Sequence, residues 1–366
     1  MSKRKCFFLI FFIYLAAGAS AIEYAIFYPI NDSTQIGITG SPYASYMSES
    51  GLGAGLSLIF FEKSIMGKKS IQNDFNMRLT GEINADKKQE FAIKGRLPLR
   101  KYHSKIALLA EYKKHDLEYW GIGGNTSQDS EVSFASEHYL FSGSIDHFLR
   151  QNISLGIAWD LSGYDSTIDT AYPVDDLPSG ATGFSRNIGF GGVISYSTKY
   201  PNNFPLQGVY YQNKLLYYEK AIASDFLFVT WQQDFQYFYP INRHVIASQI
   251  LSFCTFRDRP FYYYPAQGGS SFMRGQQTDR YKDKQLLGAQ TEYRSPIIFW
   301  RVSAVCYGAT AISYQGLGDF VSENFHFTGG GGLRFALDKE ERVNIRADLG
   351  FSREGYQIYL KFGEAF

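Results

Sequence analysis

Polar and apolar residues alternate along most of this chain, as they do in β-strands that present one face to water and the other to an apolar environment. The clearest runs place every second residue on an apolar face: Phe75, Met77, Leu79 and Ile83; Leu227, Val229, Trp231, Phe235, Tyr237 and Tyr239; Ile345, Ala347, Leu349 and Phe351. No comparable stretch has the 3.6-residue period of an amphipathic helix. The pattern predicts an all-β protein.

The same pattern predicts fifteen strands and one weaker one. The fifteen cover residues 51–62, 70–84, 89–101, 104–121, 137–150, 152–167, 184–199, 208–219, 224–241, 243–256, 285–296, 299–312, 326–338, 341–352 and 356–366. The weaker strand lies within 28–40. It brings the total to sixteen, because a bacterial barrel with both ends of its chain on one side of the membrane has an even number of strands. Residues 40–50 then form an outer connection.

Strand length separates a soluble sandwich from a membrane barrel. Strands of soluble proteins have a mode of about 5–6 residues, whereas strands that cross a bilayer need ~9–11, and several runs here reach that length. Their polar faces carry charged residues in mid-strand, as a wet lumen would allow, and their apolar faces often end in aromatic residues, as at a membrane interface. We therefore predict a transmembrane antiparallel β-barrel of about 16 strands, with residues 51–366 as its main part.

Connection lengths alternate between the predicted strands. The long connections are 122–136, 168–183, 257–284 and 313–325, and the tight ones are 101–104, 150–152, 240–243 and 338–341. Outer-membrane barrels have short periplasmic turns and longer outer loops. The long connections, 257–284 among them, are therefore expected on the outer side.

The N-terminus has the features of a secretory signal peptide over residues 1–21. A positively charged end precedes an apolar run from Phe7 to Leu15, and Ala19-Ser20-Ala21 supplies an A-x-A cleavage site. Cleavage would leave a short N-terminal segment, 22–50, that contains the possible first strand. Export and a barrel fold together predict a location in an outer membrane of the Gram-negative type, with membrane lipid as a partner.

Composition narrows the function classes. Lys and Arg number 36 and Asp and Glu 35, a net charge of +1 that argues against a nucleic-acid partner. None of the six His lies in a hydrolase or metalloprotease motif, so we predict no catalytic residue, no metal and no cofactor. His138 and Ser142 share a polar strand face, which keeps an enzyme as the less favoured alternative. Cys254 and Cys306 remain after export, and the sequence leaves open whether they pair.

Several stretches resemble the BamA/TamA (bacterial surface antigen) outer-membrane superfamily. They are Phe272-Met273-Arg274-Gly275, then Leu286-Leu287 followed by Glu292-Tyr293-Arg294-Ser295-Pro296, and finally Arg346 to Gly350 with Phe362 to Phe366. The first is similar to the family's hydrophobic-Arg-Gly-aromatic motif, with Gln276 in place of the aromatic residue. The others are similar to the family's next strand and to its last hairpin with a terminal Phe. The specific part of the resemblance covers residues 272–366.

The resemblance implies that loop 257–284 folds back into the lumen and that Arg274 and Gly275 form a latch there. A buried Arg needs an acidic partner, because an unpaired buried charge is costly. Glu292 is the first candidate, by resemblance and because its neighbours on the same strand face are polar, and Asp348 is the second. In the alternative, Arg274 is simply solvated in an outer loop.

Two departures from the family affect this interpretation. The family usually has an Asp two residues before a Gly on the strand after the Glu-Tyr-Arg strand, where this chain has Cys306 before Gly308. The usual acidic partner of the loop Arg is therefore expected to be missing. Family members with a known role also carry periplasmic POTRA domains, which are too long for residues 22–50. We expect a barrel-only member whose POTRA-like function comes from a separate periplasmic partner.

The last strand resembles the C-terminal signal that outer-membrane insertion machinery recognises. Its residues are Tyr356, Ile358, Leu360, Phe362 and Phe366. The resemblance implies a barrel that assists protein or lipid insertion or translocation. Such a barrel would open the seam between its first and last strands and offer the strand edges to a client. A passive or structural pore without translocase activity is the alternative.

Overall fold

The structure is a computed structural model that describes residues 26–31, 34–64, 75–168, 177–201, 204–336 and 344–366. These residues form β-strands and short 3-10 turns. Within the described ranges, no helix is long and apolar enough to cross a membrane. The expected signal peptide, 1–21, and the tight connection expected at 338–341 both lie outside the described residues.

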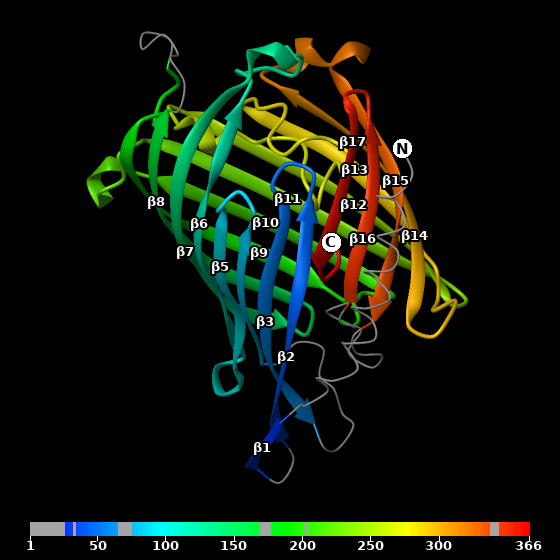
Figure 1. Ribbon diagram of the computed structural model, residues 1–366. Coiled ribbons are helices and arrows are strands. Elements are labelled where there is room, and N and C mark those ends of the chain that lie inside the picture. Colours follow the sequence, from blue (N-terminus) through cyan, green and yellow to red (C-terminus); the bar gives the residue numbers. More distant parts are fainter. Residues whose placement is uncertain (1–25, 32–33, 65–74, 169–176, 202–203, 337–343) are drawn as a thin grey trace.

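Sixteen antiparallel strands form a closed wall (Figure 1), as the sequence predicts. They are β2 (Thr34–Met47), β3 (Gly51–Ser64), β4 (Asn76–Asn84), β5 (Gln89–Leu99), β6 (Ser104–Tyr119), β7 (Val132–Arg150), β8 (Ile153–Ile168), β9 (Gly183–Ser197), β10 (Gly208–Tyr218), β11 (Phe228–Ile241), β12 (His244–Arg257), β13 (Gln285–Arg294), β14 (Val302–Tyr314), β15 (Phe325–Ala336), β16 (Asn344–Ser352) and β17 (Gly355–Phe362). Each strand pairs with the next, and β17 returns to β2. A further strand, β1 (Ile26–Asn31), forms a hairpin with β2 that extends beyond the wall (Figure 1).

The start of the wall differs from the prediction. The first wall strand is not confined to 28–40, because β2 runs to Met47, and the expected outer connection 40–50 is reduced to the turn 48–50. The alternation is weak here because small residues stand on both faces. Ser45 is buried on the inner face, and Ala44 lies on the outer one. Proline is mostly confined to strand edges, and Pro42 lies on a strand with a barely paired edge.

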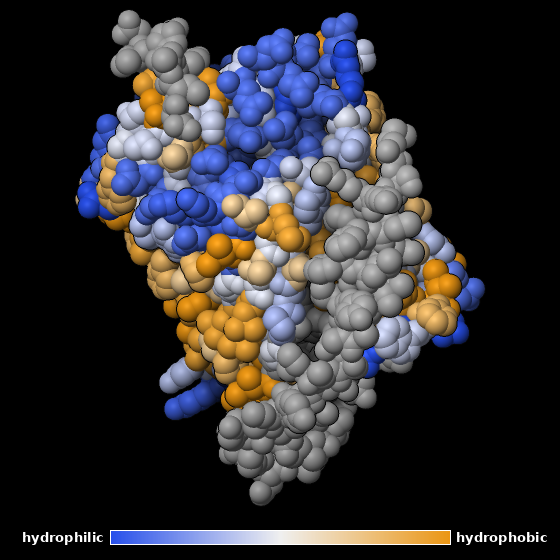
Figure 2. All heavy atoms as spheres, viewed as in Figure 1, coloured by the Kyte–Doolittle hydropathy of each residue, from blue (hydrophilic) through white to orange (hydrophobic). Residues whose placement is uncertain are grey.

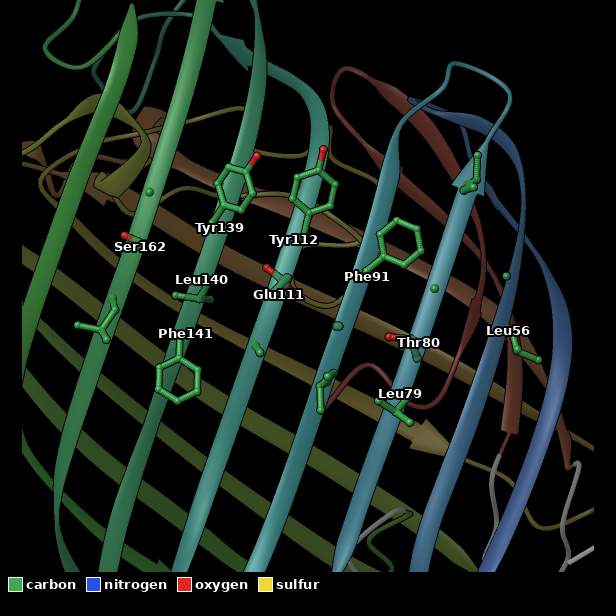
Figure 3. Close-up of a pocket in the computed structure, with 18 of the residues that line it drawn as sticks. Leu56, Leu79, Thr80, Phe91, Glu111, Tyr112, Tyr139, Leu140, Phe141 and Ser162 are labelled. Atoms are coloured by element: carbon green, nitrogen blue, oxygen red, sulfur yellow. The ribbon is translucent and has the colours of Figure 1, made fainter.

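Side chains alternate between the lumen and the outer surface. Phe91 and Tyr139 point outward (Figure 3) and are about half exposed, whereas Glu111 faces the lumen, where it contacts Lys113. Figure 2 shows apolar residues gathered over the lower wall and hydrophilic residues at the end that carries most loops. An apolar outer belt around a polar interior is the arrangement of membrane-spanning barrels.

The two ends of the barrel carry different connections. We call the end with connections 120–131, 219–227 and 258–284 the loop end, and the end with 100–103 and 151–152 the turn end. The predicted alternation of long and short connections therefore places 258–284 at the loop end.

Candidate functional site

The connection between β12 and β13, residues 258–284, lies within the barrel rather than above it (Figure 1, yellow). Met273, Arg274, Gln276 and Arg280 are each at most 2% exposed. A loop that projected into solvent could not bury this many long side chains. The segment therefore crosses the lumen, and its charged residues need partners on the inner wall.

Arg274 contacts three strands from the centre of this loop. Its Nη2 lies 2.6 Å from Glu292 Oε2 on β13, and its Nη1 lies 3.1 Å from Asp348 Oδ2 on β16. Its guanidinium carbon lies 3.5 Å from the ring centroid of Tyr307 on β14, a cation–π contact. Burial alone would lower the pKa of Arg274, but the two carboxylates outweigh burial and raise that pKa above its usual value.

Three further arginines share these carboxylates. Arg294 Nε lies 2.8 Å from Glu292 Oε1, and Arg346 Nη1 lies 2.6 Å from Asp348 Oδ2. Arg334 binds Asp348 Oδ1 at 2.6 Å and Glu364 Oε2 at 2.8 Å. We call the seven side chains the charged network: Arg274, Glu292, Arg294, Arg334, Arg346, Asp348 and Glu364. Four positive charges thus face three negative ones, and every member is at most 5% exposed.

Glycines bring the loop and the wall into direct contact. Gly275 has φ +109°, in the region that favours glycine, and a Cβ there would lie 2.5 Å from the Phe351 nitrogen. A Cβ on Gly350 would lie 2.6 Å from the Arg274 carbonyl carbon, and one on Gly332 would lie 2.1 Å from Asp348 Oδ1. The loop backbone therefore lies flat on β16, and the glycines of β15 leave room for the Asp348 carboxylate.

Arg274 has two carboxylate partners, although Cys306 replaces the acidic residue expected on this strand. Cys306 is exposed on the outer face of β14, so a side chain at that position points away from the loop. Its neighbour Tyr307 points inward beneath the guanidinium, and Asp348 supplies the second carboxylate from β16. Cys254 lies on β12, two strands from Cys306, and both thiols are free, so they do not pair.

The sequence predicts a latch of Arg274, Gly275, Glu292 and Asp348. In the structure, Glu292 and Asp348 both contact Arg274, and Gly275 lies against the backbone of β16. The prediction missed Arg334, Arg346, Tyr307 and Glu364. Arg346 and Asp348 are two residues apart on one strand, so the alternation places both on the same face. Arg346 could therefore have been predicted from the sequence as a neighbour of Asp348. Nothing in one strand's pattern says which neighbour a long side chain reaches across the lumen, so Arg334 and Glu364 could not be assigned.

The seam between β17 and β2 is the second element of the site. Among the described residues, two residue pairs join these strands, Tyr359 with Met47 and Leu360 with Tyr46, whereas β2 pairs with β3 from Thr34 to Met47. At the loop end the Ile358 nitrogen donates to Ser48 Oγ at 2.9 Å. The backbone ladder between β17 and β2 is therefore short, and side-chain contacts supplement it.

Side chains bridge the seam inside the lumen. Glu82 on β4 accepts from Ser45 Oγ of β2 at 2.6 Å and from Tyr43 at 3.1 Å. It also accepts from Lys361 Nζ of β17, at 3.2 Å. One carboxylate thus connects both edge strands, and we call this arrangement the Glu82 bridge.

The lumenal loop also contacts the hairpin turns on both sides of the seam. The Thr278 nitrogen donates to Glu49 Oε1 in the β2–β3 turn at 2.7 Å. Arg280 Nη2 lies 2.8 Å from Glu354 Oε1 in the β16–β17 turn, which also accepts from Tyr281 at 2.8 Å. We call these contacts the loop clasp, because one loop ties together the two edges that the backbone barely joins.

The terminal residues depart from the predicted shared face. Tyr356 is 61% exposed on the outer side of β17, and Ile358 and Leu360 share its parity. Phe366, however, lies beyond the end of β17 and packs inward against Phe238. Its carbonyl oxygen accepts from Arg294 Nη2 at 3.2 Å, so the chain end bends into the lumen after the last strand. The Phe362 side chain lies outside the described residues.

The two candidate enzyme residues, His138 and Ser142, both lie on β7, and His138 Nδ1 lies 3.9 Å from Glu111 Oε1. The His138 ring stacks on Tyr164, with centroids 4.0 Å apart. Across the described part of the chain, no group of three His, Cys, Asp or Glu side chains could hold a metal ion.

Comparison with known proteins supplies the fold class. No protein-family model matches this sequence, and no curated protein does either. Among solved structures, the chain is similar to BamA from Haemophilus ducreyi lacking POTRA domains 1-3, with TM-score 0.58 and 14% identity, over 94% of this chain and 76% of that one. It is also similar to CdiB from Acinetobacter baumannii, with TM-score 0.58 and 7% identity, over 91% of this chain and 60% of that one. CdiB from Escherichia coli gives TM-score 0.57 and 10% identity, over 91% and 63%.

The chain is therefore an antiparallel sixteen-strand β-barrel with the fold of BamA and CdiB barrels. It spans less than two thirds of the length of each CdiB chain. At these identities the likeness concerns the fold, including the closed wall.

Proposed function

We propose that this protein is an outer-membrane barrel that assists insertion or translocation of proteins or lipids, and that its β17–β2 seam is where a client meets it. The seam carries the proposal, because two residue pairs join strands that are otherwise long enough for a full ladder. Edge strands present unpaired N–H and C=O groups that another chain can pair with. A barely paired edge within a closed wall provides such a template with little backbone bonding to break.

Opening the seam would require three sets of side-chain contacts to separate. They are the Glu82 bridge in the lumen, the Ser48 contact at the loop end and the loop clasp. Each is polar and each can re-form after opening, which suits a reversible gate better than a permanent wall. The loop clasp couples the seam to the lumenal loop, because Thr278 and Arg280 hold opposite edges.

Arg274 acts in this proposal as the latch that holds the lumenal loop in place. Its two carboxylate contacts come from strands β13 and β16, so they fix the loop against the half of the wall that ends at the seam. Charge-assisted contacts of this kind are stronger than neutral hydrogen bonds and hold a set geometry. A latched loop keeps Thr278 and Arg280 positioned to clasp the seam.

A disulfide across the seam tests the proposal. Tyr46 and Leu360 are direct cross-strand partners, and opposite residues lie within the Cα separation that a disulfide accepts. The double variant Tyr46→Cys/Leu360→Cys would be made with Cys254→Ser and Cys306→Ser. The full chain, in liposomes, would be given a urea-unfolded eight-strand outer-membrane barrel, whose folding is followed as a heat-modifiable band. Oxidation should abolish acceleration of that folding, and a reductant should restore it.

The matched control joins two strands that stay paired. Ala44 and Ala54 are direct partners on β2 and β3, so Ala44→Cys/Ala54→Cys places a disulfide next to the seam without crossing it. Its oxidation should leave the acceleration unchanged. Equal folding rates with the seam open and locked would instead support the passive-pore alternative.

Location in the outer membrane is part of the same proposal. The outer apolar belt and the expected signal peptide at 1–21 support it. Deleting Phe366 should lower the amount of assembled protein, because it removes an inward anchor that packs on Phe238 and contacts Arg294. The assembled fraction would be measured as the heat-modifiable band in isolated membranes. Finding the wild-type protein soluble in the periplasm would refute the location.

We further propose that POTRA-like functions are supplied by a separate periplasmic protein. The described residues form the barrel and the β1–β2 hairpin, and that hairpin extends beyond the wall at the turn end (Figure 1). A photo-crosslinking residue at Tyr28 should capture such a partner in intact cells. The same residue on the loop end, at Leu317, serves as the control.

A further inference from the structure

The first strand, β1, lies on the edge of β2 that faces the seam. Residues Thr34–Ile38 of β2 pair with β3 on one edge, and the same residues also pair with β1. A strand has two edges, so β1 occupies the edge that β3 leaves, and this is the edge that meets β17 at Tyr46 and Met47. We call it the seam edge of β2. β1 therefore covers one part of the seam edge and β17 another.

The parts of the seam edge that β1 and β17 cover do not overlap. Leu360 pairs with Tyr46 in antiparallel register, so the last residue of β17, Phe362, would face Ala44 in that register. The part that pairs with β1 begins at Ile38, further toward the turn end, and Figure 1 shows the β1–β2 hairpin below the wall. An uncovered edge is a template for any extended chain, because its N–H and C=O groups are unpaired. β1 therefore protects a stretch of β2 that β17 does not reach as a strand.

The ladder between β1 and β2 is short and interrupted. Its register shifts between Pro29 and Asn31, whereas β2 pairs with β3 without interruption from Thr34 to Met47. Proline has no N–H to donate, and both proline and bulges are features of strands that end a sheet. An incoming strand that replaced β1 would therefore break the shorter of these two ladders on β2.

The connection between β1 and β2 keeps β1 close to the seam edge after displacement. Two residues separate Asn31 from its partner Thr34, and two-residue loops are the commonest hairpin connections. Hairpins form in about 1–10 μs. β1 would therefore pair again with β2 soon after an incoming strand leaves. A short ladder and a short connection together suit a reversible cover.

We propose that β1 is a built-in cover for the seam edge, which a client strand displaces in order to pair with β2 along its whole length. β1 and a client strand cannot both pair with Thr34–Ile38, because β3 holds the other edge of these residues. The inference rests on the proposed function, since it takes the client to be an extended polypeptide that pairs with this edge. It adds an order of events: the client pairs beside β17 first and then advances toward the turn end as β1 leaves.

Disulfide trapping with single cysteines on β2 tests the cover. Ile36→Cys labels the part that pairs with β1, and Ala44→Cys labels the part beside β17, each with Cys254→Ser and Cys306→Ser. The two positions are an even number of residues apart, so they share a strand face. The full chain in liposomes would be given the urea-unfolded eight-strand barrel with single cysteines placed in turn along its last strand. We expect trapping by Ala44→Cys and at least fivefold less by Ile36→Cys.

A pair of prolines in β1 removes the cover. Phe27→Pro/Tyr28→Pro changes two neighbouring residues, and one of them has to donate to β2, because hydrogen bonds alternate along an antiparallel edge. The prolines should raise trapping by Ile36→Cys at least fivefold and leave trapping by Ala44→Cys unchanged. Leu317→Pro is the control, since it introduces a proline in an exposed connection at the loop end and should change neither. Heat-modifiability shows that each variant is folded.

The outcomes separate the cover from the function on which it rests. The cover is refuted if Ile36→Cys traps the client equally well with and without the two prolines, or less well with them. If Ala44→Cys traps no client in any variant, the proposed function fails and this inference fails with it. Trapping by Ala44→Cys alone, unchanged by the prolines at either position, refutes the cover and leaves the proposed function standing.

Discussion

The lumen contains two clusters of arginine and lysine that differ in how far water can reach them. In the charged network, four arginines face three carboxylates, and all seven side chains are buried. On the inward faces of β4 and β5, Arg78 lies directly opposite Lys94, and Arg96 follows Lys94 by two residues. We call these three side chains the basic triad, in which Lys94 and Arg96 are exposed. The charged network is closed to water, and the basic triad is open to it.

The difference indicates what each cluster does. A buried charge without a partner is costly, so a matched and buried cluster holds elements together. Here it joins the lumenal loop to β13 and β16. Charges that water can reach are screened, so the basic triad should contribute little to holding the wall. The following substitutions should therefore affect the two clusters in different ways.

The largest effect is expected from Glu292→Gln. Glu292 contacts Arg274, Arg294 and Arg334, so its neutralisation leaves four arginines facing two carboxylates. Removing one partner of a buried pair costs ~3–5 kcal/mol. We expect a strong loss of assembled protein, measured as the heat-modifiable band. Glu137→Gln removes an exposed carboxylate on the outer face and should assemble normally.

Arg274→Ala should loosen the loop more than it destabilises the wall. Without Arg274, three arginines still face three carboxylates, so the network stays balanced. We expect larger single-channel conductance and faster proteolysis within 258–284, with heat-modifiability retained. Arg274→Lys should rescue only in part, because an ammonium group cannot reproduce the bidentate fork. Unchanged conductance and proteolysis in the Ala variant would show that no latch exists.

Gly350→Ala tests the loop contact without changing any charge. The new Cβ would lie 2.6 Å from backbone atoms of Arg274 and Gly275, so the loop has to move. Overpacking of this kind typically costs about 1–3 kcal/mol. Proteolysis within 258–284 should increase, though less than for Arg274→Ala. Gly308→Ala is the control, since its Cβ would meet no atom closer than 3.9 Å, and it should behave as wild type.

The smallest effect is expected from Lys94→Gln, and it should have the opposite sign. It removes the like-charge pair with Arg78, which should stabilise the barrel by up to about 1 kcal/mol. Urea unfolding in detergent micelles would measure the change. A loss of stability would mean that Lys94 has a structural partner, and the contrast between the two clusters would then fail.

The sequence by itself determined the all-β fold, the sixteen-strand wall and the lumenal neighbours of Arg274. Period-two alternation is a local property of each strand, so it can be recognised in the sequence without any information on tertiary contacts. The strand count followed from parity and connection lengths. The residues around Arg274 followed from a resemblance at 272–366, which carries three-dimensional information that alternation lacks.

Only the tertiary structure decided how the wall closes and which charges meet. The length of β2 was missed because small residues blur its two faces, and β1 lies outside the wall altogether. The inward bend of Phe366, the Glu82 bridge and the loop clasp join residues that are far apart in sequence. The contrast between the two clusters is of the same kind. Alternation tells which face a charged side chain occupies, but the curvature of the closed wall decides which opposite charge it can reach.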